Sequence, residues 1–266
     1  MNNNAMMNAM TKVNGELMVI VTGRIAQLIK DTKTDKNYNA HNLAVDALKI
    51  AREEIKNFDN VHFMPGEPNE KTGIYSIDLL PYVTCHPRCR ETCGKINRGC
   101  KFNKGKCYAF RLIYRNSATC ARYAINTALA IDRPDTFFAD VDLLLKVSRY
   151  IRAFVSGDLN LPGFAKKFFD TIKNNPFCNV QGFSKCYEVV NDYISKYGKP
   201  DNLKLLLSGW DGMQPDNPHN LPVSDVYEEA LPEGWLSCGG NCLHCACVGL
   251  GCWKAENGDV VGLKKH

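Results

Sequence analysis

The hydrophobic pattern of the chain changes from helical spacing in its first part to short apolar runs alternating with helices in its second. Apolar residues recur at helical spacing over 39–57, 107–131, 135–149, 161–174 and 187–197. Continuous apolar runs predict strands at 73–83, 151–155, 179–183 and 203–207. Runs without polar alternation suit parallel strands that are covered on both faces. Successive strand–helix steps therefore predict an α/β fold with a parallel sheet and right-handed crossovers.

The same pattern divides the chain into four parts. We expect a disordered tail at 1–12, an N-terminal helical segment at 13–72, a β/α core at 73–230 and a C-terminal cysteine-rich segment at 231–266. The Pro- and Asn-rich stretch 213–235 is typical of a loop that crosses the domain. Residues 259–266 could add one edge strand.

Polar residues follow three of the predicted strands. They are Ser156-Gly157-Asp158, Ser184-Lys185 and Ser208-Gly209-Trp210-Asp211. Ligands of parallel α/β folds gather at the carboxyl ends of strands, so this rim is a candidate site, with Asp158, Lys185 and Asp211 lining its pocket as catalytic candidates. The alternative is that these residues only form turns and cap the next helix.

Ten of the 13 cysteines fall in two short segments. The first holds Cys85, Cys89, Cys93, Cys100 and Cys107, and the second holds Cys238, Cys242, Cys245, Cys247 and Cys252. The chain shows no export signal, which predicts a cytoplasmic protein in which disulfides do not persist. Both segments are rich in Gly and polar residues and predict loops that need metal to order them. Of the other three, we expect Cys120 to be a core thiol and Cys178 and Cys186 to be structural.

The spacing of the cysteines favours iron over zinc. Runs such as Cys-x3-Cys-x3-Cys and Cys-x3-Cys-x2-Cys-x-Cys are more typical of iron–sulfur ligation than of paired zinc knuckles. We expect one or two iron–sulfur clusters of the 4Fe–4S type, with zinc as the alternative. His86, His244 and His266 are candidate nitrogen ligands, although a lone histidine is more often surface.

Several short motifs resemble those of the phage gene product 88 family. They are Thr84-Cys85, Cys107-Tyr108-Ala109, Val155-Ser156-Gly157-Asp158, Phe183-Ser184-Lys185 and the Cys-rich segment from Cys238 to His266. The resemblance covers residues 73–266 and implies a shared architecture more than a reaction.

The chain is more distantly similar to radical S-adenosylmethionine (SAM) enzymes. That likeness implies a partial parallel β/α barrel, a 4Fe–4S cluster on Cys85, Cys89 and Cys93, and SAM held by Ser156-Gly157-Asp158. This chain departs from the usual Cys-x3-Cys-x2-Cys loop of those enzymes, having Cys-x3-Cys-x3-Cys. Radical chemistry needs one iron left open, so four cysteines closing a site would exclude it.

Charge supports a different hypothesis. Between Cys85 and Arg115 there are nine Lys or Arg residues and one acid, although the net charge of the chain is only +5. The basic segment 88–115 could bind nucleic acid, with Tyr108, Phe110 and Tyr114 as stacking faces. No apolar run is long enough to cross a membrane. Three functions therefore stay open: an iron–sulfur protein that could be a radical enzyme of unknown substrate, a zinc-stabilised nucleic-acid-binding protein, and a phage accessory protein with structural metal.

Overall fold

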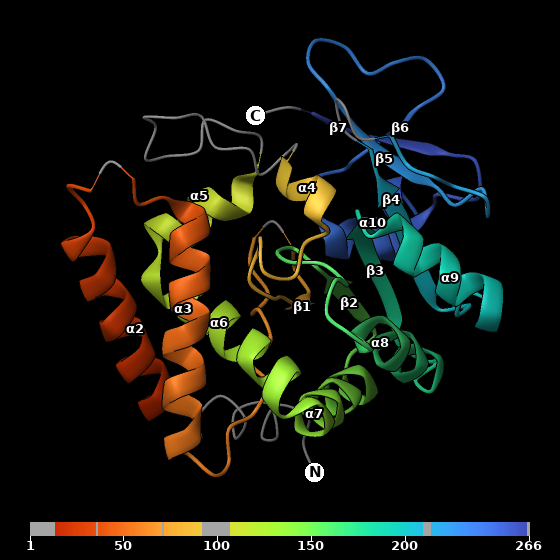
Figure 1. Ribbon diagram of the computed structural model, residues 1–266. Helices are drawn as coiled ribbons and strands as arrows, with labels where there is room; N and C mark the ends of the chain where they lie inside the picture. Colours follow the sequence, from red (N-terminus) through yellow and green to blue (C-terminus); the bar gives the residue numbers. More distant parts are fainter. Residues whose placement is uncertain (1–13, 36, 71, 92–106, 210–213, 265–266) are drawn as a thin grey trace.

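A parallel sheet of seven strands runs through the described part of the chain (Figure 1). This computed structural model describes residues 14–35, 37–70, 72–91, 107–209 and 214–264. The strands are β1 Tyr75–Ile77, β2 Tyr150–Ala153, β3 Asn179–Ser184, β4 Leu203–Ser208, β5 Val223–Tyr227, β6 Leu236–Ser237 and β7 Val260–Lys264. Their order across the sheet is β1-β2-β3-β4-β5-β7-β6, and every neighbouring pair is parallel.

Helices connect the first four strands. They are α4 Pro87–Glu91, α5 Tyr108–Arg115, α6 Ser117–Asp132 and α7 Pro134–Val147 between β1 and β2, then α8 Phe164–Lys173 and α9 Tyr187–Tyr197. Before the sheet come α2 Gly15–Asp31, α3 Ala40–Glu54 and the 3-10 turn η1 Ile55–Asn57; after β6 come α10 Cys242–Val248 and the 3-10 turn η2 Gly251–Trp253. The predicted α/β fold with a parallel sheet is confirmed.

The two faces of the sheet are covered differently. Ile151, Val180 and Leu205 belong to the main core, together with phenylalanines of α8 and Val190 of α9. Strand residues of the opposite parity, among them Tyr150, Phe183 and Leu206, pack against the C-terminal segment that carries η2. Because side chains alternate along a strand, helices cover one face and the second cysteine-rich segment covers the other.

The N-terminal helices extend the main core on the side of α6. Leu17, Val21 and Ile25 are the buried positions of α2 and recur at spacings of four, so one face of this helix is apolar. Asn39 caps α3, because its side chain accepts hydrogen bonds from the backbone N–H groups of His41 and Asn42. No helix in the described ranges combines the length and apolar character that crossing a membrane requires.

Two predicted elements are wrong in their extent. The helix expected over 107–131 is broken at Asn116, whose extended backbone (φ −134°, ψ 97°) ends α5 and whose side chain caps α6 by accepting from Thr119 N. Capping by a side-chain amide competes with continued helix, which explains the break. The stretch 213–235, predicted as a loop, contains β5. The tail 1–12 lies outside the described residues.

The C-terminal region departs further from the sequence-based expectation. The second cysteine-rich segment is not all loop, because it forms α10. The predicted edge strand near the C-terminus, β7, lies between β5 and β6 and not at an edge. The described strands form an open sheet with β1 and β6 at its two edges, so the predicted partial barrel is not confirmed.

Candidate metal centre

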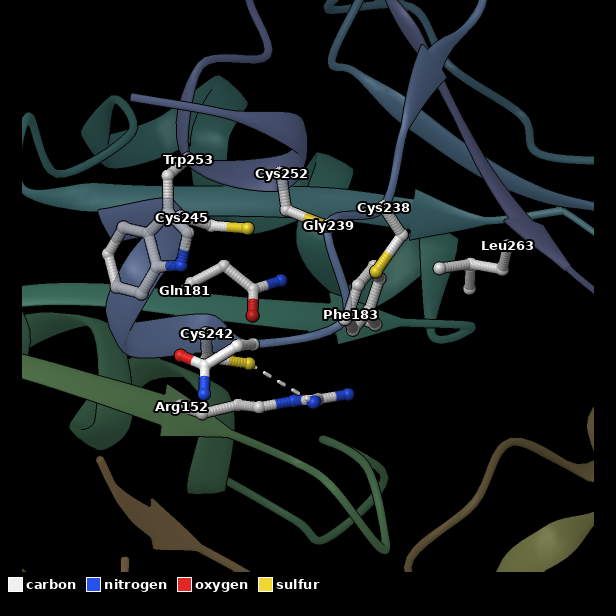
Figure 2. Close-up of a pocket in the computed structure, with 12 residues that line it drawn as sticks. Arg152, Gln181, Phe183, Cys238, Gly239, Cys242, Cys245, Cys252, Trp253 and Leu263 are labelled. Carbon is white, nitrogen blue, oxygen red and sulfur yellow. Dashed lines mark hydrogen bonds between the residues drawn. The ribbon is translucent and has the colours of Figure 1, made fainter. Parts of the chain in front are cut away.

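Four cysteines of the second segment line one cavity on the strand face that carries no helix of the α6–α9 group. Cys238 follows β6, Cys242 and Cys245 lie on α10, and Cys252 lies on η2. The cavity measures about 60 Å³, and we call it the cysteine pocket. Its floor includes Arg152 of β2 with Gln181 and Phe183 of β3. In Figure 2 the four sulfur atoms lie around the side-chain amide of Gln181.

The helix α10 explains which cysteines face the pocket. Cys242 and Cys245 are three residues apart and therefore share one helix face. Cys247 is about 200° further round than Cys245 at about 100° per residue, and it is exposed and absent from the lining. Asn241 caps the helix by accepting from His244 N at 2.8 Å, and its amide donates to Glu70 O at 2.9 Å. The predicted ligand Cys247 is thus separated from the other four.

Aromatic and backbone contacts hold the segment against the sheet. Trp253 packs edge-to-face on Tyr150 of β2 with ring centroids 5.4 Å apart. Cys238 N donates to Gly262 O of β7 at 3.2 Å. A Cβ at Gly239 would lie 2.7 Å from Cys245 Sγ, so only glycine allows this close approach of backbone to thiol. The pocket is therefore closed by residues that are distant in sequence from its floor.

Two thiols of the pocket, those of Cys252 and Cys245, are shifted towards their protonated form. A hydrogen bond with the Cys238 side chain and burial together raise the pKa of Cys252. Burial also raises the pKa of Cys245. Metal binding requires thiolates, so a metal entering this pocket would release protons.

Two nitrogen atoms on the pocket floor lack hydrogen-bond partners. Arg152 Nε and Gln181 Nε2 are buried, and neither has a partner among the described residues. The other end of the guanidinium, Arg152 Nη1, donates to Cys242 Sγ at 3.4 Å. Buried donors are normally paired, so an acceptor in the pocket would satisfy both groups.

The sulfur atoms do not gather around a single point. Within the described ranges, no group of three or more His, Cys, Asp or Glu side chains could hold one metal ion. A zinc ion needs its thiolate sulfurs about 2.3 Å away. In this structure the four thiols line the pocket without forming such a group.

The first cysteine segment is only partly described. Cys93 and Cys100 lie outside the described residues, and so do Lys95, Arg98, Lys101, Lys104 and Lys106 of the basic segment. Cys85 and Cys107 are half-buried and Cys89 is buried, and all three pack against the main core. The prediction that this segment binds metal stays a prediction.

The predicted rim of polar strand ends is present as a chain of hydrogen bonds. Asp158 N donates to Thr84 Oγ1 at 3.0 Å, which joins the end of β2 to the segment before Cys85. Asp158 Oδ1 accepts from Ser184 Oγ and its Oδ2 from Lys185 N, both at 2.7 Å. Lys185 Nζ in turn donates to Ser208 Oγ. The structure brings these strand ends together, whereas Asp211 lies outside the described residues.

Asp158 is buried and links the ends of β2 and β3 through the hydrogen bonds of its carboxylate. Its side chain is 5% exposed, and burial raises its pKa although the backbone N–H groups of Lys185 and Leu159 favour the carboxylate. Ser156 is buried as well. At Gly157 the backbone has φ +82°, and a Cβ would lie 2.7 Å from Thr84 Oγ1 and Leu79 Cβ. The turn predicted to hold SAM is therefore packed against the chain itself, and its role in cofactor binding stays a prediction.

Other candidate residues have local roles. Arg90 donates to the carbonyls of Cys85 and Val83 and lies over the Tyr82 ring. Phe110, one of the proposed stacking faces, is 2% exposed and belongs to the core. His244 is on the exposed side of α10, and His266 lies outside the described residues. Arg90 and Phe110 thus have contacts within the fold, and nucleic-acid binding by the basic segment stays a prediction.

The remaining three cysteines are core residues, as predicted. Cys120, Cys178 and Cys186 are each 0% exposed. Burial raises the pKa of Cys120 and of Cys178 to about 12. These thiols are packing groups.

The residues that sequence reasoning missed are Arg152 and Gln181. Each is a polar residue inside an otherwise apolar run, IRAFV and NVQGF. A buried polar residue in such a strand needs a partner, and this was the signal that could have identified them.

Comparison with known proteins identifies a family. The family model described as Gene product 88 matches residues 47–251. No curated protein and no solved structure matches the chain. The chain belongs to the gene product 88 family.

Proposed function

We propose that this member of the gene product 88 family is an iron–sulfur protein that holds its cluster in the cysteine pocket. The observation that carries the proposal is the convergence of Cys238, Cys242, Cys245 and Cys252 on one cavity, onto which two unpartnered buried N–H groups also open. Cysteine thiolates hold iron–sulfur clusters, and hydrogen bonds to the sulfur atoms help to set their reduction potential.

The spacing of the cysteines supports a cluster over a single ion. Runs such as Cys-x3-Cys-x2-Cys are more typical of iron–sulfur ligation than of paired zinc knuckles. A cluster with several irons is bound at its corners and suits thiols arranged around a volume. A cavity of about 60 Å³ is also several times larger than the space that one water molecule fills.

The number of thiols limits the chemistry at this site. Four cysteines supply all four protein ligands of a 4Fe–4S cluster and leave no iron open. Such a cluster carries electrons and ties its ligand segments together. Radical chemistry with SAM would need a different, open site, for which the sequence offers Cys85, Cys89 and Cys93. We therefore propose for the cysteine pocket an electron-carrying cluster that also fastens the C-terminal segment to the sheet.

The test is the metal content of protein purified without oxygen. We expect iron, acid-labile sulfide and a broad visible absorption that fades on reduction by dithionite. Cys245→Ser and Cys252→Ser should each lower iron and sulfide by the content of one cluster. Cys247→Ser is the matched control, because this exposed cysteine lies on the same helix outside the pocket and should retain the wild-type content.

Circular dichroism of each variant separates loss of the cluster from loss of the fold. A wild-type protein that is colourless and holds one zinc without sulfide would overturn the proposal. Equal loss of iron in Cys247→Ser and Cys245→Ser would assign the cluster to a different set of ligands.

A further inference from the structure

The floor of the cysteine pocket is built from two residues in register on neighbouring strands. Arg152 of β2 pairs with Gln181 of β3 in the parallel ladder, so their side chains lie next to each other on one face. Gln181 is 1% exposed, and its Nε2 has no partner among the described residues. The sheet fixes the Cα positions of both residues, so these positions do not depend on the segment that carries the cysteines.

Arg152 places a positive charge beside the sulfur atoms. Its Nη1 lies 3.4 Å from Cys242 Sγ, and its guanidinium carbon lies 5.6 Å from the centre of the Phe183 ring. No carboxylate of the described ranges forms an ion pair with it. A guanidinium stays protonated in proteins, since its ordinary pKa lies above about 12. The charge is therefore present at every pH of interest and is not neutralised by a carboxylate.

A cation and N–H donors act differently on the two oxidation states of a cluster. Reduction adds one negative charge to the cluster, and opposite charge or hydrogen bonds stabilise the more negative state more strongly. Low solvent access strengthens this effect, because a buried site has a lower effective dielectric constant.

We propose that Arg152 and Gln181 tune the reduction potential of the cluster by donating hydrogen bonds to its sulfur atoms. The inference rests on the proposed function and adds to it the residues that regulate the same site. Arg152 supplies charge and two donors, Nε and Nη1, whereas Gln181 supplies an uncharged donor. They are positioning residues and not ligands, so replacing them should change the potential and leave the cluster in place.

The test is a redox titration of the anaerobically purified full-length protein, followed by electron paramagnetic resonance. Arg152→Gln should lower the equilibrium constant for cluster reduction at least tenfold, about 59 mV for a one-electron couple. Arg152→Lys keeps the charge, so its cluster should have a reduction potential between those of Arg152→Gln and the wild type. Gln181→Met keeps the side-chain length without the donor. It should lower the reduction potential by less than Arg152→Gln does.

Arg149→Gln is the matched control for loss of one positive charge. The Arg149 guanidinium lies over the Tyr150 ring at 5.3 Å, outside the pocket lining. The reduction potential of the cluster in this variant should therefore equal that of the wild type. If Arg152→Gln loses the cluster, Arg152→Lys and Gln181→Met decide the question.

Two failures are distinguishable. A wild-type protein without iron overturns the proposed function and this inference with it. Variants that retain the wild-type iron content and the wild-type potential overturn this inference alone. An equal shift in Arg149→Gln would assign the effect to overall charge and would also overturn it.

Discussion

Tyr150 and Trp253 pack edge-to-face with ring centroids 5.4 Å apart, joining the second strand of the sheet to the C-terminal cysteine-rich segment. Trp253 is 9% exposed and shares a small core with Ile74 and Cys245. This core is separate from the main one beneath the helices. The segment that carries the cysteines is thus attached to the sheet by few apolar contacts, which makes those contacts decisive for the pocket.

Trp253→Ala should destabilise the protein by about 3 kcal/mol, since it removes a large buried side chain and leaves a cavity. It should also lower the retention of iron, because Cys252 is the neighbouring residue. Urea unfolding and iron analysis measure the two effects. Phe177→Ala is the control: this ring is 94% exposed, so its loss should change stability by less than about 0.5 kcal/mol. Equal effects in both variants would contradict the role given to Trp253.

Gly157→Ala should destabilise the protein by about 3 kcal/mol, because it combines left-handed strain with a steric clash. The added Cβ would lie 2.7 Å from Leu79 Cβ and Thr84 Oγ1. Gly163→Ala provides a matched comparison, since φ there is +70° and nothing lies within 4 Å. It should cost only the strain, about 1 kcal/mol. Thermal unfolding compares the two, and similar costs would show that Leu79 and Thr84 move away easily.

Asp140 should make stability depend on pH. Burial raises its pKa above 3.8, although Phe63 N and His62 favour its charged form. The folded state therefore binds this proton more tightly than the unfolded chain. Stability from this group is complete below pH 3.8 and is lost as pH rises through the folded-state pKa.

Asp140→Asn should remove that dependence, because an amide does not titrate in this range and its oxygen can still accept from Phe63 N. The unfolding free energy of wild type minus variant should fall as pH rises above about 4. Urea unfolding across this range measures it. A difference that rises with pH would show that the carboxylate is stabilised in the folded state.

Cys120→Ser should destabilise the protein by about 2 kcal/mol, because it places a hydroxyl group in an apolar core position. Its iron content should equal that of the wild type, since Cys120 packs within α6 in the main core. Iron analysis and thermal unfolding together make the test. A loss of iron per folded molecule would place Cys120 among the ligands.

Removing the metal should loosen the C-terminal segment while the sheet persists. Anaerobic treatment with a chelator should make residues 238–255 sensitive to protease, because four of the residues that fix this segment would lose their shared partner. The far-ultraviolet circular dichroism should change little, since the helices α2–α9 pack in the main core. Cleavage that begins within α6 or α7 would instead show that metal supports the main core.

Local pattern was sufficient for much of the sheet. The runs at 151–155, 179–183 and 203–207 correspond to β2, β3 and β4 within one or two residues. Such runs can be recognised because burial on both faces demands continuous apolar side chains. β5 was missed because VSDVY contains the polar residues Ser224 and Asp225 and lies in a stretch rich in Pro and Asn. Its pairing with β4 and β7 joins segments that are distant in sequence.

The spacing of the cysteines could not show which thiols of the two segments face a shared pocket. The likeness to radical SAM enzymes implies a cluster on the first segment, which stays a prediction, and the pocket among the described residues is formed by the second segment. Cys247 belongs to the second cluster in sequence, but the helix turns it away. Spacing shows which thiols are close along the chain and not which share a helix face once α10 forms.

The sequence by itself determined that this is a parallel α/β protein with far more cysteine than packing requires, because both properties lie in local composition and period. Only the tertiary structure decided that four of those cysteines meet Arg152 and Gln181. Arg152 and Cys242 are 90 residues apart, and they meet because strand register fixes one side chain while the returning C-terminal segment brings the other. Contacts of that kind depend on the packing of the whole sheet, which no local pattern encodes.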